Sequence, residues 1–308
     1  MIRTNIEEIY NTNEEPNKID FSNGRNIIYF NRRKELKQMI KSINSQINNN
    51  SQSLFLTYYF MDLIFTNNDL EKIFFNHFNS RDYLMPLKDI QMNNYALLSV
   101  ACLMISYKFA ENNPKMPSVN SFVKLLYHFS KKNFIFNIDD LITAEVVALK
   151  LLKYKLNYYT IYQFFVFFFT HGIIFKQTMQ LSKLYGKLSE KKILEKIYIQ
   201  AREILDWIID SEQYYNYYFG KDNHIIVVVI LLWSMEHILG IKIQNNENVF
   251  KLIFNINIKE EKYNKIVEII EKLYLLKKRN IQNINKPLYT NKNMSKKTIT
   301  FNNQLSFP

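Results

Sequence analysis

The sequence predicts an all-α fold of two tandem helical bundles with flexible extensions at both termini. Two segments, residues 95–111 and 225–239, are apolar on nearly every side, as helices buried inside a bundle are. Elsewhere apolar residues recur at spacings of three and four, which is the pattern of an amphipathic helix. At 308 residues the chain can hold one large domain or two of ordinary size, and we assign one bundle to each buried segment.

The N-terminal part of the chain begins with a polar arm and continues with two predicted helices. Residues 1–25 are polar with little periodicity, so we expect a flexible arm with one short helix at 6–11. Residues 27–47 and 54–65 form the first two helices, separated by a polar loop. Residues 66–94 are a long connection rich in aromatic residues, which predicts a packed extra helix followed by a loop.

The segment 95–111 is the predicted central helix of the first bundle. It contains no proline or glycine, and its small residues would let neighbouring helices approach closely on several faces. These small residues are Ala96, Ser99, Cys102 and Ser106. Lys108 places a charge near the end of the helix, just before the chain leaves it through Asn112, Asn113 and Pro114.

Two more helices complete the first predicted bundle, at residues 122–129 and 140–152. Asp139 and Asp140 are the expected cap and first-turn acids of the second of these. After this first turn the predicted helix is mostly apolar, and Glu145 is its one acidic side chain. Lys108 and Glu145 therefore place one cation and one anion at the edges of two apolar helices.

The second half of the chain is also helical in pattern. We expect an amphipathic helix at 193–209, a buried central helix at 225–239, and further helices at 249–254 and 263–275. The last 28 residues, 281–308, are rich in Asn, Lys and Thr, so we expect a disordered tail.

Two stretches of the first half resemble the cyclin box. They are CLMISYKFAE at residues 102–111, followed by Pro117, and AEVVALKLLKYKLNYYTIYQF at residues 144–164. The resemblance covers residues 26–165 and implies a five-helix cyclin fold there. By analogy it implies a second cyclin-like helical domain at residues 166–280.

The resemblance also implies a function and a site. In cyclins the lysine and glutamate at the positions of Lys108 and Glu145 contact the regulatory helix of a partner kinase. The expected groove between them is apolar, with Ile105, Phe109, Leu149, Tyr154 and Leu156 as its floor. Arg33 and Asp62 match an arginine–aspartate pair that joins the first two helices of the cyclin box. The chain would thus be a regulatory subunit that binds and activates a cyclin-dependent protein kinase, in cell-cycle or transcriptional control.

The first helix departs from the family at the patch where many cyclins dock short substrate motifs. The chain reads RRKEL at residues 32–36, so charged groups replace apolar ones there. Substrate docking at this patch is therefore not expected. The position after Phe109 is Ala110 where cyclins often have an acidic residue, which removes one contact to a partner.

The net charge of +12 and pI near 9.4 would suit an acidic partner, but the lysines are scattered along the chain. One alternative is therefore a two-box general transcription factor of the same fold that binds DNA. Such proteins usually carry a zinc ribbon, which a chain with one cysteine cannot form. A second alternative is a helical scaffold without a kinase partner. We do not expect nucleic acid as the partner.

No pattern in the sequence indicates catalysis. The five glycines are too far apart for a phosphate-binding loop, and the five histidines show no ligand spacing. Cys102 lies in the predicted central helix, where a small buried side chain is expected. We therefore expect no enzyme activity, no metal, no cofactor and no small-molecule substrate. The longest apolar runs are too short to span a membrane, and we expect the protein in the nucleus or the cytoplasm.

Overall fold

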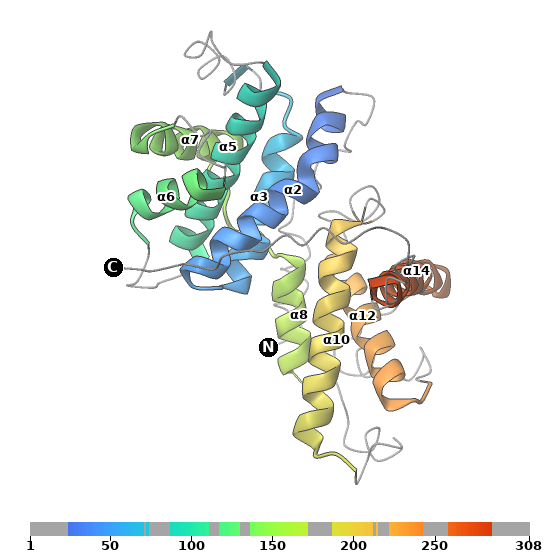
Figure 1. Cartoon of the computed structure of the whole chain (residues 1–308). Coiled ribbons are helices and arrows are strands. Elements are labelled where there is room, and N and C mark those ends of the chain that lie inside the picture. The colour runs from blue at the N-terminus through green and yellow to red at the C-terminus, as the bar shows by residue number, and fades with distance from the viewer. Residues whose placement is uncertain are drawn as a thin grey trace, which may run out of the picture.

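The structure is a computed structural model in which the described residues form an all-helical protein (Figure 1). Two groups of helices follow each other along the chain, one at the top and one at the bottom of the view. The described residues are 24–70, 72–73, 87–110, 117–129, 136–171, 187–211, 214, 222–242 and 258–284. The predicted N-terminal arm with its helix at 6–11, and most of the tail, lie outside these residues.

The first bundle is organised around helix α5 (Leu87–Ala110), which packs against the other four helices of the group. These are α2 (Gly24–Ile47), α3 (Ser51–Phe65), α6 (Val119–Phe129) and α7 (Ile138–Leu151). The small residues of α5 are buried, and the hydroxyls of Ser99 and Ser106 donate to carbonyls one turn earlier. No polar group of these serines is therefore left unsatisfied where the neighbouring helices come close.

The observed helices are longer than the sequence predicts. Helix α2 begins three residues before the predicted start at residue 27, and α3 begins at Ser51 because Asn50 caps it by accepting from the amide of Ser53. Helix α5 begins at Leu87, inside the predicted connection 66–94. Residues 74–86 of that connection lie outside the described residues.

The second bundle consists of α8 (Ile161–Thr170), α10 (Glu190–Asp210), α12 (Asn223–Leu239) and α14 (Glu260–Ile284). Helix α12 packs against the other three. The predicted domain boundary at residue 165 falls inside α8, which packs on α12 and on α3. The predicted helix at 249–254 lies outside the described residues, and α14 continues beyond residue 281, the predicted start of the tail. A second five-helix cyclin fold therefore stays a prediction.

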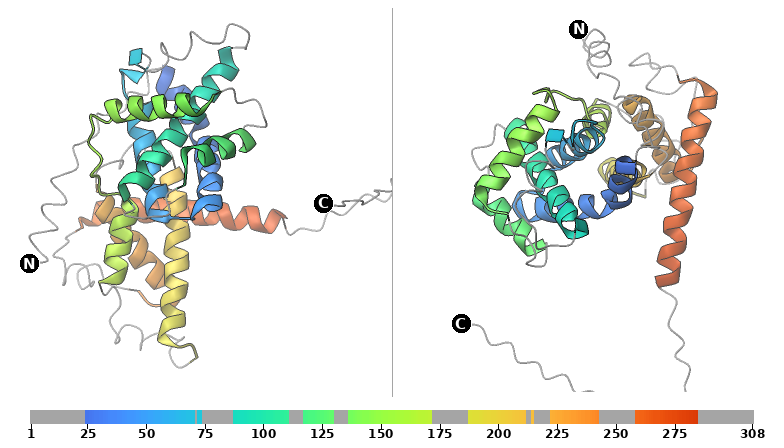
Figure 2. Two further views of the ribbon diagram at one scale, coloured as in Figure 1. Left: turned by 90° about the vertical axis from the view of Figure 1, so that its left-hand side faces the viewer. Right: turned by 90° about the horizontal axis from the view of Figure 1, so that it is seen from above.

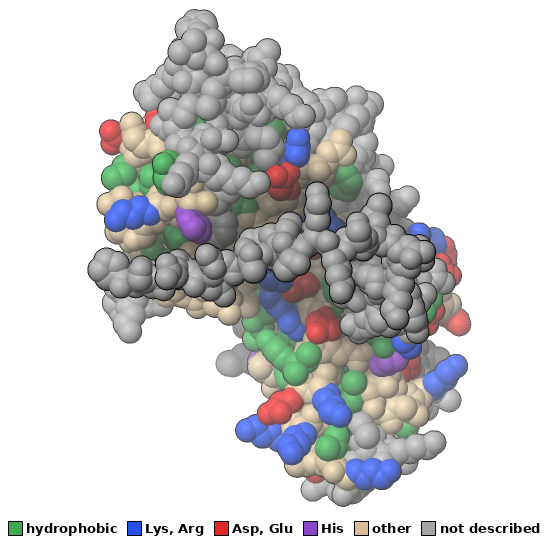
Figure 3. Space-filling model, viewed as in Figure 1, with side chains coloured by type: hydrophobic (Ala, Val, Ile, Leu, Met, Phe, Trp, Pro, Cys, Tyr) green, Lys and Arg blue, Asp and Glu red, His purple; other side chains and the backbone are tan. Residues whose placement is uncertain are grey.

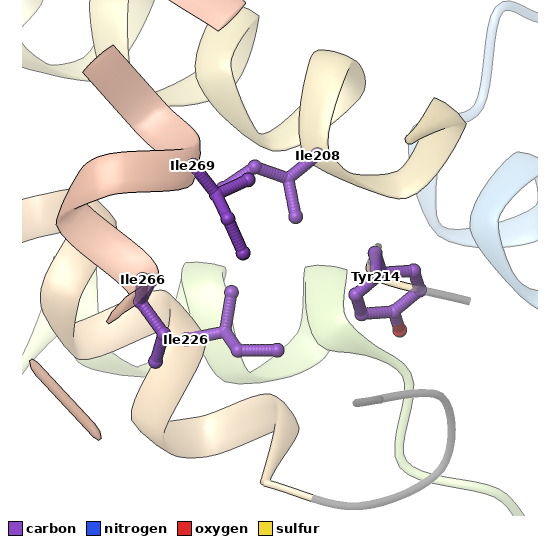
Figure 4. A pocket seen from close by; sticks show the side chains of 5 residues that line it. All are labelled: Ile208, Tyr214, Ile226, Ile266 and Ile269. Carbon is purple, nitrogen blue, oxygen red and sulfur yellow. The ribbon is translucent and has the colours of Figure 1, made fainter. Parts of the chain in front are cut away.

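An apolar space lies where α10, α12 and α14 meet. It is lined by Ile208, Tyr214, Ile226, Ile266 and Ile269 (Figure 4). The hydroxyl of Tyr214 donates to Asn223 at 2.9 Å, and the other lining side chains are isoleucines. We assign this space to the packing of the second bundle.

The two bundles are joined by cations on α2 that meet the C-terminal end of α10. Arg33 binds Asp62 of α3 through two parallel hydrogen bonds of 2.7 and 2.8 Å. Its third nitrogen donates to the carbonyl of Ile209, in the last turn of α10, at 2.9 Å. One buried guanidinium thus ties the first bundle to the second and supplies a donor to a helix end whose carbonyls lack intrahelical partners.

Lys37 and Lys41 extend this contact along α2 at intervals of four residues. The ammonium of Lys37 lies 3.4 Å from the carbonyl of Ile209 and 3.6 Å from Asp210. Lys41 lies 3.4 Å from Asp206, one turn earlier on α10. Positive charge at the C-terminus of a helix is also favoured by the helix dipole.

Among the described residues, no helix is long and apolar enough to cross a lipid bilayer.

Candidate functional site

Helix α7 carries the glutamate of the predicted site, and its start is fixed by a capping box. The side chain of Asn137 accepts from the amide of Asp140 at 3.0 Å, and Asp140 accepts from the amide of Asn137 at 2.9 Å. The predicted cap at Asp139 is therefore wrong: Asn137 is the cap, and α7 begins at Ile138 rather than residue 140. Asp139 and Asp140 do lie in the first turn.

The structure brings Lys108 and Glu145 together. The ammonium of Lys108, in the last turn of α5, donates to Oε1 of Glu145. The side chain of Lys108 is 44% exposed and that of Glu145 is 11% exposed. Ala144 and Ala148 of α7 are buried where this helix packs on α5, and their small size allows the two helix backbones to approach. An ion pair therefore lies at the edge of the α5–α7 contact, with its cation facing solvent.

The five predicted apolar residues of the site differ in exposure. Phe109 and Tyr154 are exposed, and Leu149 and Leu156 are partly buried. Ile105 is only 2% exposed, because it packs in the core of the first bundle. Ile105 therefore lies outside any exposed surface, while Phe109 directly follows Lys108 and Leu149 lies one turn after Glu145 on α7.

Tyr154 is held at the surface by the way α7 ends. Lys153 and Tyr154 both have left-handed backbone conformations, with φ of 53° and 56°. The amide of Tyr154 donates to the carbonyl of Leu149 at 2.9 Å, which closes the last turn of the helix. The chain then turns away with the ring of Tyr154 exposed.

An apolar stripe along α7 was not predicted from the sequence. Ile138, Ile142 and Val146 follow one another at intervals of four, and all three side chains are exposed. Residues at this spacing share one helix face, and Val146 directly follows Glu145. Apolar side chains reach the surface over α6 and α7 at the upper left of Figure 3. The spacing of four residues could have indicated this stripe. It is not evident in the sequence because the buried face of α7 is apolar too.

Helix α2 presents charge where many cyclins have an apolar docking patch. Leu36 and Arg33 are buried, while Arg32 and Glu35 form an ion pair of 3.0 Å at the surface. The apolar residue that the patch would need is therefore part of the core. The other predicted pair, Arg33 and Asp62, lies at the interface between the bundles.

The electrostatics of Asp62 follow from its burial and its partners. Burial raises the pKa of this carboxyl, but the charge and hydrogen bonds of Arg33 outweigh that effect. The hydroxyl of Tyr29 also donates to Asp62, at 2.6 Å. The pKa of Asp62 is therefore lowered, and the carboxylate is charged in the folded protein.

Cys102 is the single thiol of the chain, and it is fully buried in α5. Burial raises its pKa, so the reactive thiolate is not available there. The part of the chain that the structure describes contains no cluster of His, Cys, Asp and Glu that could hold a metal ion.

Comparison with known proteins adds one finding. A family model described as the cyclin N-terminal domain matches residues 4–157, which is half of the chain. The matched range includes α2, α3, α5, α6 and α7, and with them both predicted charge pairs. A search of the curated proteins finds no match for this chain.

Proposed function

The chain belongs to the cyclin family, and from this premise we propose that it is a regulatory subunit that binds and activates a cyclin-dependent protein kinase. Members of this family regulate rather than catalyse. The observation that carries the proposal is the ion pair of Lys108 and Glu145, which are 37 residues apart in the sequence and directly precede the exposed apolar residues Phe109 and Val146.

Among the residues that the structure describes, the pair has hydrogen-bonding capacity left for a partner. A lysine ammonium has three donors, and one of them is used by Glu145. A carboxylate can accept on both oxygens, and Lys108 occupies Oε1. A helix laid beside the pair would receive further donors from Lys108 and an acceptor from Glu145 for the polar groups that it brings to this point. The internal ion pair would hold both side chains in place before the partner arrives.

The apolar residues around the pair would supply most of the binding free energy. Phe109 and Tyr154 are large and exposed, and aromatic residues are frequent hot spots of protein interfaces. The stripe of Ile138, Ile142 and Val146 extends the apolar surface along α7. An amphipathic helix of the kinase could place its apolar face on this surface.

Binding of this kind activates a kinase without any chemistry by the cyclin. A protein kinase is active when the glutamate of its regulatory helix pairs with the lysine of the ATP site. A partner that binds only the inward position of that helix shifts the population toward the active form. We place this activity in the nucleus or the cytoplasm.

The proposal is tested by exchanging the two charges. The double variant Lys108→Glu with Glu145→Lys keeps an ion pair within the chain but reverses the charge that the partner contacts at each position. We expect affinity purification from the native cell to recover a protein kinase with the wild-type chain, and at least tenfold less of it with the variant. Quantitative mass spectrometry measures the ratio, and a kinase assay of the recovered complex measures activation.

A matched control is available in the second bundle. Lys262 and Asp222 form another ion pair between residues distant in sequence, with both side chains partly exposed. Exchanging these two charges should leave kinase recovery unchanged. Equal recovery with the Lys108/Glu145 exchange, or no kinase with the wild-type chain, would contradict the proposed function.

A further inference from the structure

The C-terminal half of α14 exposes two adjacent leucines. Leu275 is 52% exposed and Leu276 is 48% exposed. The helix is 25 residues long, and its C-terminal end extends past the other helices of the second bundle (Figure 2). Scattered apolar residues are common on protein surfaces, but a pair of large ones on a projecting helix is a feature of interaction surfaces.

The rotation of α14 is fixed by an aromatic cluster on its inner face. The ring of Tyr274 packs on Trp233 at 5.3 Å and on His237 at 5.1 Å, and its hydroxyl lies 3.1 Å from Nε2 of His237. Three residues later, Lys277 lies over the ring of Trp207 at 5.7 Å. Because Tyr274 and Lys277 point inward to this cluster, Leu275 and Leu276 are turned away from the bundle and cannot be buried by a small rotation of the helix.

Glu271 lies one turn before Leu275, and the charge on α14 after it has one sign. Lys272, Lys277 and Lys278 are exposed, and no acidic residue occurs from residue 272 to the end of the sequence. The acids of α14 all precede this point, and the last of them is Glu271. The helix dipole does not account for these lysines, because none of them lies in the last turn of α14. It does not account for the apolar side chains exposed between them either.

We propose that this end of α14 is a docking surface for a protein segment that carries apolar side chains flanked by carboxylates. The two leucines would bury the apolar residues, and the lysines would pair with the acids. A nucleic acid would use the lysines and leave the leucines uncovered, so the observations favour a protein. The proposal is independent of the kinase surface, which lies on α5 and α7.

A selection experiment identifies the class of ligand directly. A random peptide library is displayed on phage, selected on the full-length protein, and counter-selected on the variant Leu275→Ser with Leu276→Ser. We expect enriched peptides that combine large apolar residues with Asp or Glu. The affinity of an enriched peptide, measured by fluorescence anisotropy, should fall at least tenfold for the leucine variant and also for Lys272→Glu with Lys278→Glu.

The control variant is Ile199→Ser, which changes a 57% exposed apolar residue on α10. It should bind the enriched peptide as the wild-type chain does, and circular dichroism should show the same helical content for all variants. Enrichment of peptides without acids, or unchanged affinity for the leucine variant, would overturn the proposal. The proposal would also be overturned if a DNA duplex or anionic lipid vesicles bound more tightly than the enriched peptide and the leucine variant retained that binding.

Discussion

Lys37 is a buried lysine at the junction of the two bundles. Its pKa is lowered to about 8, mainly by burial and also by the nearby charge of Arg33, while Asp62 and Asp210 oppose the shift. Its ammonium also lies 4.7 Å from the centre of the Tyr58 ring. Burial therefore destabilises the charged form of Lys37, and this cost is greatest at pH values at which the amine is protonated.

The lowered pKa of Lys37 predicts how the free energy of unfolding depends on pH. The unfolded chain has the ordinary lysine pKa near 10.5, so above pH 8 the unfolded state binds more protons than the folded state at this residue. The free energy of unfolding therefore gains a contribution as pH rises, by about 1–2 kcal/mol between pH 7.5 and 9.5. We expect urea denaturation to show this gain in the wild-type chain relative to Lys37→Met.

The comparison with Lys37→Met removes the effect of other titrating groups, which the two proteins share. The buried Tyr58, for instance, has a raised pKa and destabilises the fold only as the unfolded tyrosines ionise near pH 10. Parallel stability curves for the two proteins from pH 7.5 to 9.5 would show that Lys37 titrates normally.

At the scale of the helix, α7 and its cap Leu152 are followed by two successive left-handed residues, neither of which is glycine. Lys153 and Tyr154 each adopt a conformation that costs an L-amino acid about 1–2 kcal/mol. Tyr154 lies at the proposed kinase surface, but the side chain of Lys153 is exposed and has no such role. The strain at Lys153 can therefore be relieved without changing the surface.

We expect Lys153→Gly to raise the free energy of unfolding by about 0.5–1 kcal/mol, because glycine adopts positive φ without strain but has more entropy to lose. Chemical denaturation measures the change. Lys150→Gly is the matched control, since it is an exposed lysine with a helical backbone in the last turn of α7 and should lower stability by about 0.5–1 kcal/mol. A loss of stability for Lys153→Gly would contradict the assigned backbone conformation.

The sequence predicted which helices exist more accurately than where they begin. The all-α class and the central position of α5 followed from segments that are apolar all round. The start of α5 was missed because LKDIQMNN, residues 87–94, is mostly polar and lacks a helical stripe. The capping residue of α7 was missed because three polar residues, Asn137, Asp139 and Asp140, lie close together there, and only the backbone geometry distinguishes them.

The candidate site was predicted only in part. Lys108 and Glu145 were found from the family resemblance, and no local pattern could have shown that they touch. The exposure of Ile105 and Ile142 could not be read from the sequence, because α5 and α7 are apolar on several faces and packing decides which face is covered. Ile105 is buried and Ile142 is exposed for that reason alone.

At the scale of the whole molecule, Arg33 couples the two bundles. It neutralises Asp62 in the first bundle and binds the end of α10 in the second. A buried charge that loses its partner is strongly destabilising. The two bundles should therefore unfold together in the wild-type chain.

Both tryptophans of the chain, Trp207 and Trp233, lie in the second bundle, so their fluorescence reports on that bundle alone. We expect fluorescence and circular dichroism to give coincident denaturation curves for the wild-type chain. Arg33→Leu should lower the free energy of unfolding by about 3–5 kcal/mol and separate the two curves. The adjacent Arg32→Ala, which removes an exposed ion pair, should change it by about 0–1 kcal/mol and leave the curves together.

Coincident curves for Arg33→Leu would mean that other contacts, such as the packing of α3 on α8, suffice to couple the bundles.

The burial of Cys102 makes this chain suitable for labelling with thiol-reactive fluorescent dyes. Since its only native thiol is buried inside α5, a cysteine introduced at the surface would be the one group that a maleimide dye modifies. A dye at position 199 on α10 would sense motion of the second bundle, and a dye at position 127 on α6 would sense the first. Energy transfer between one such dye and a labelled kinase could then follow complex formation in real time, without first removing any natural residue.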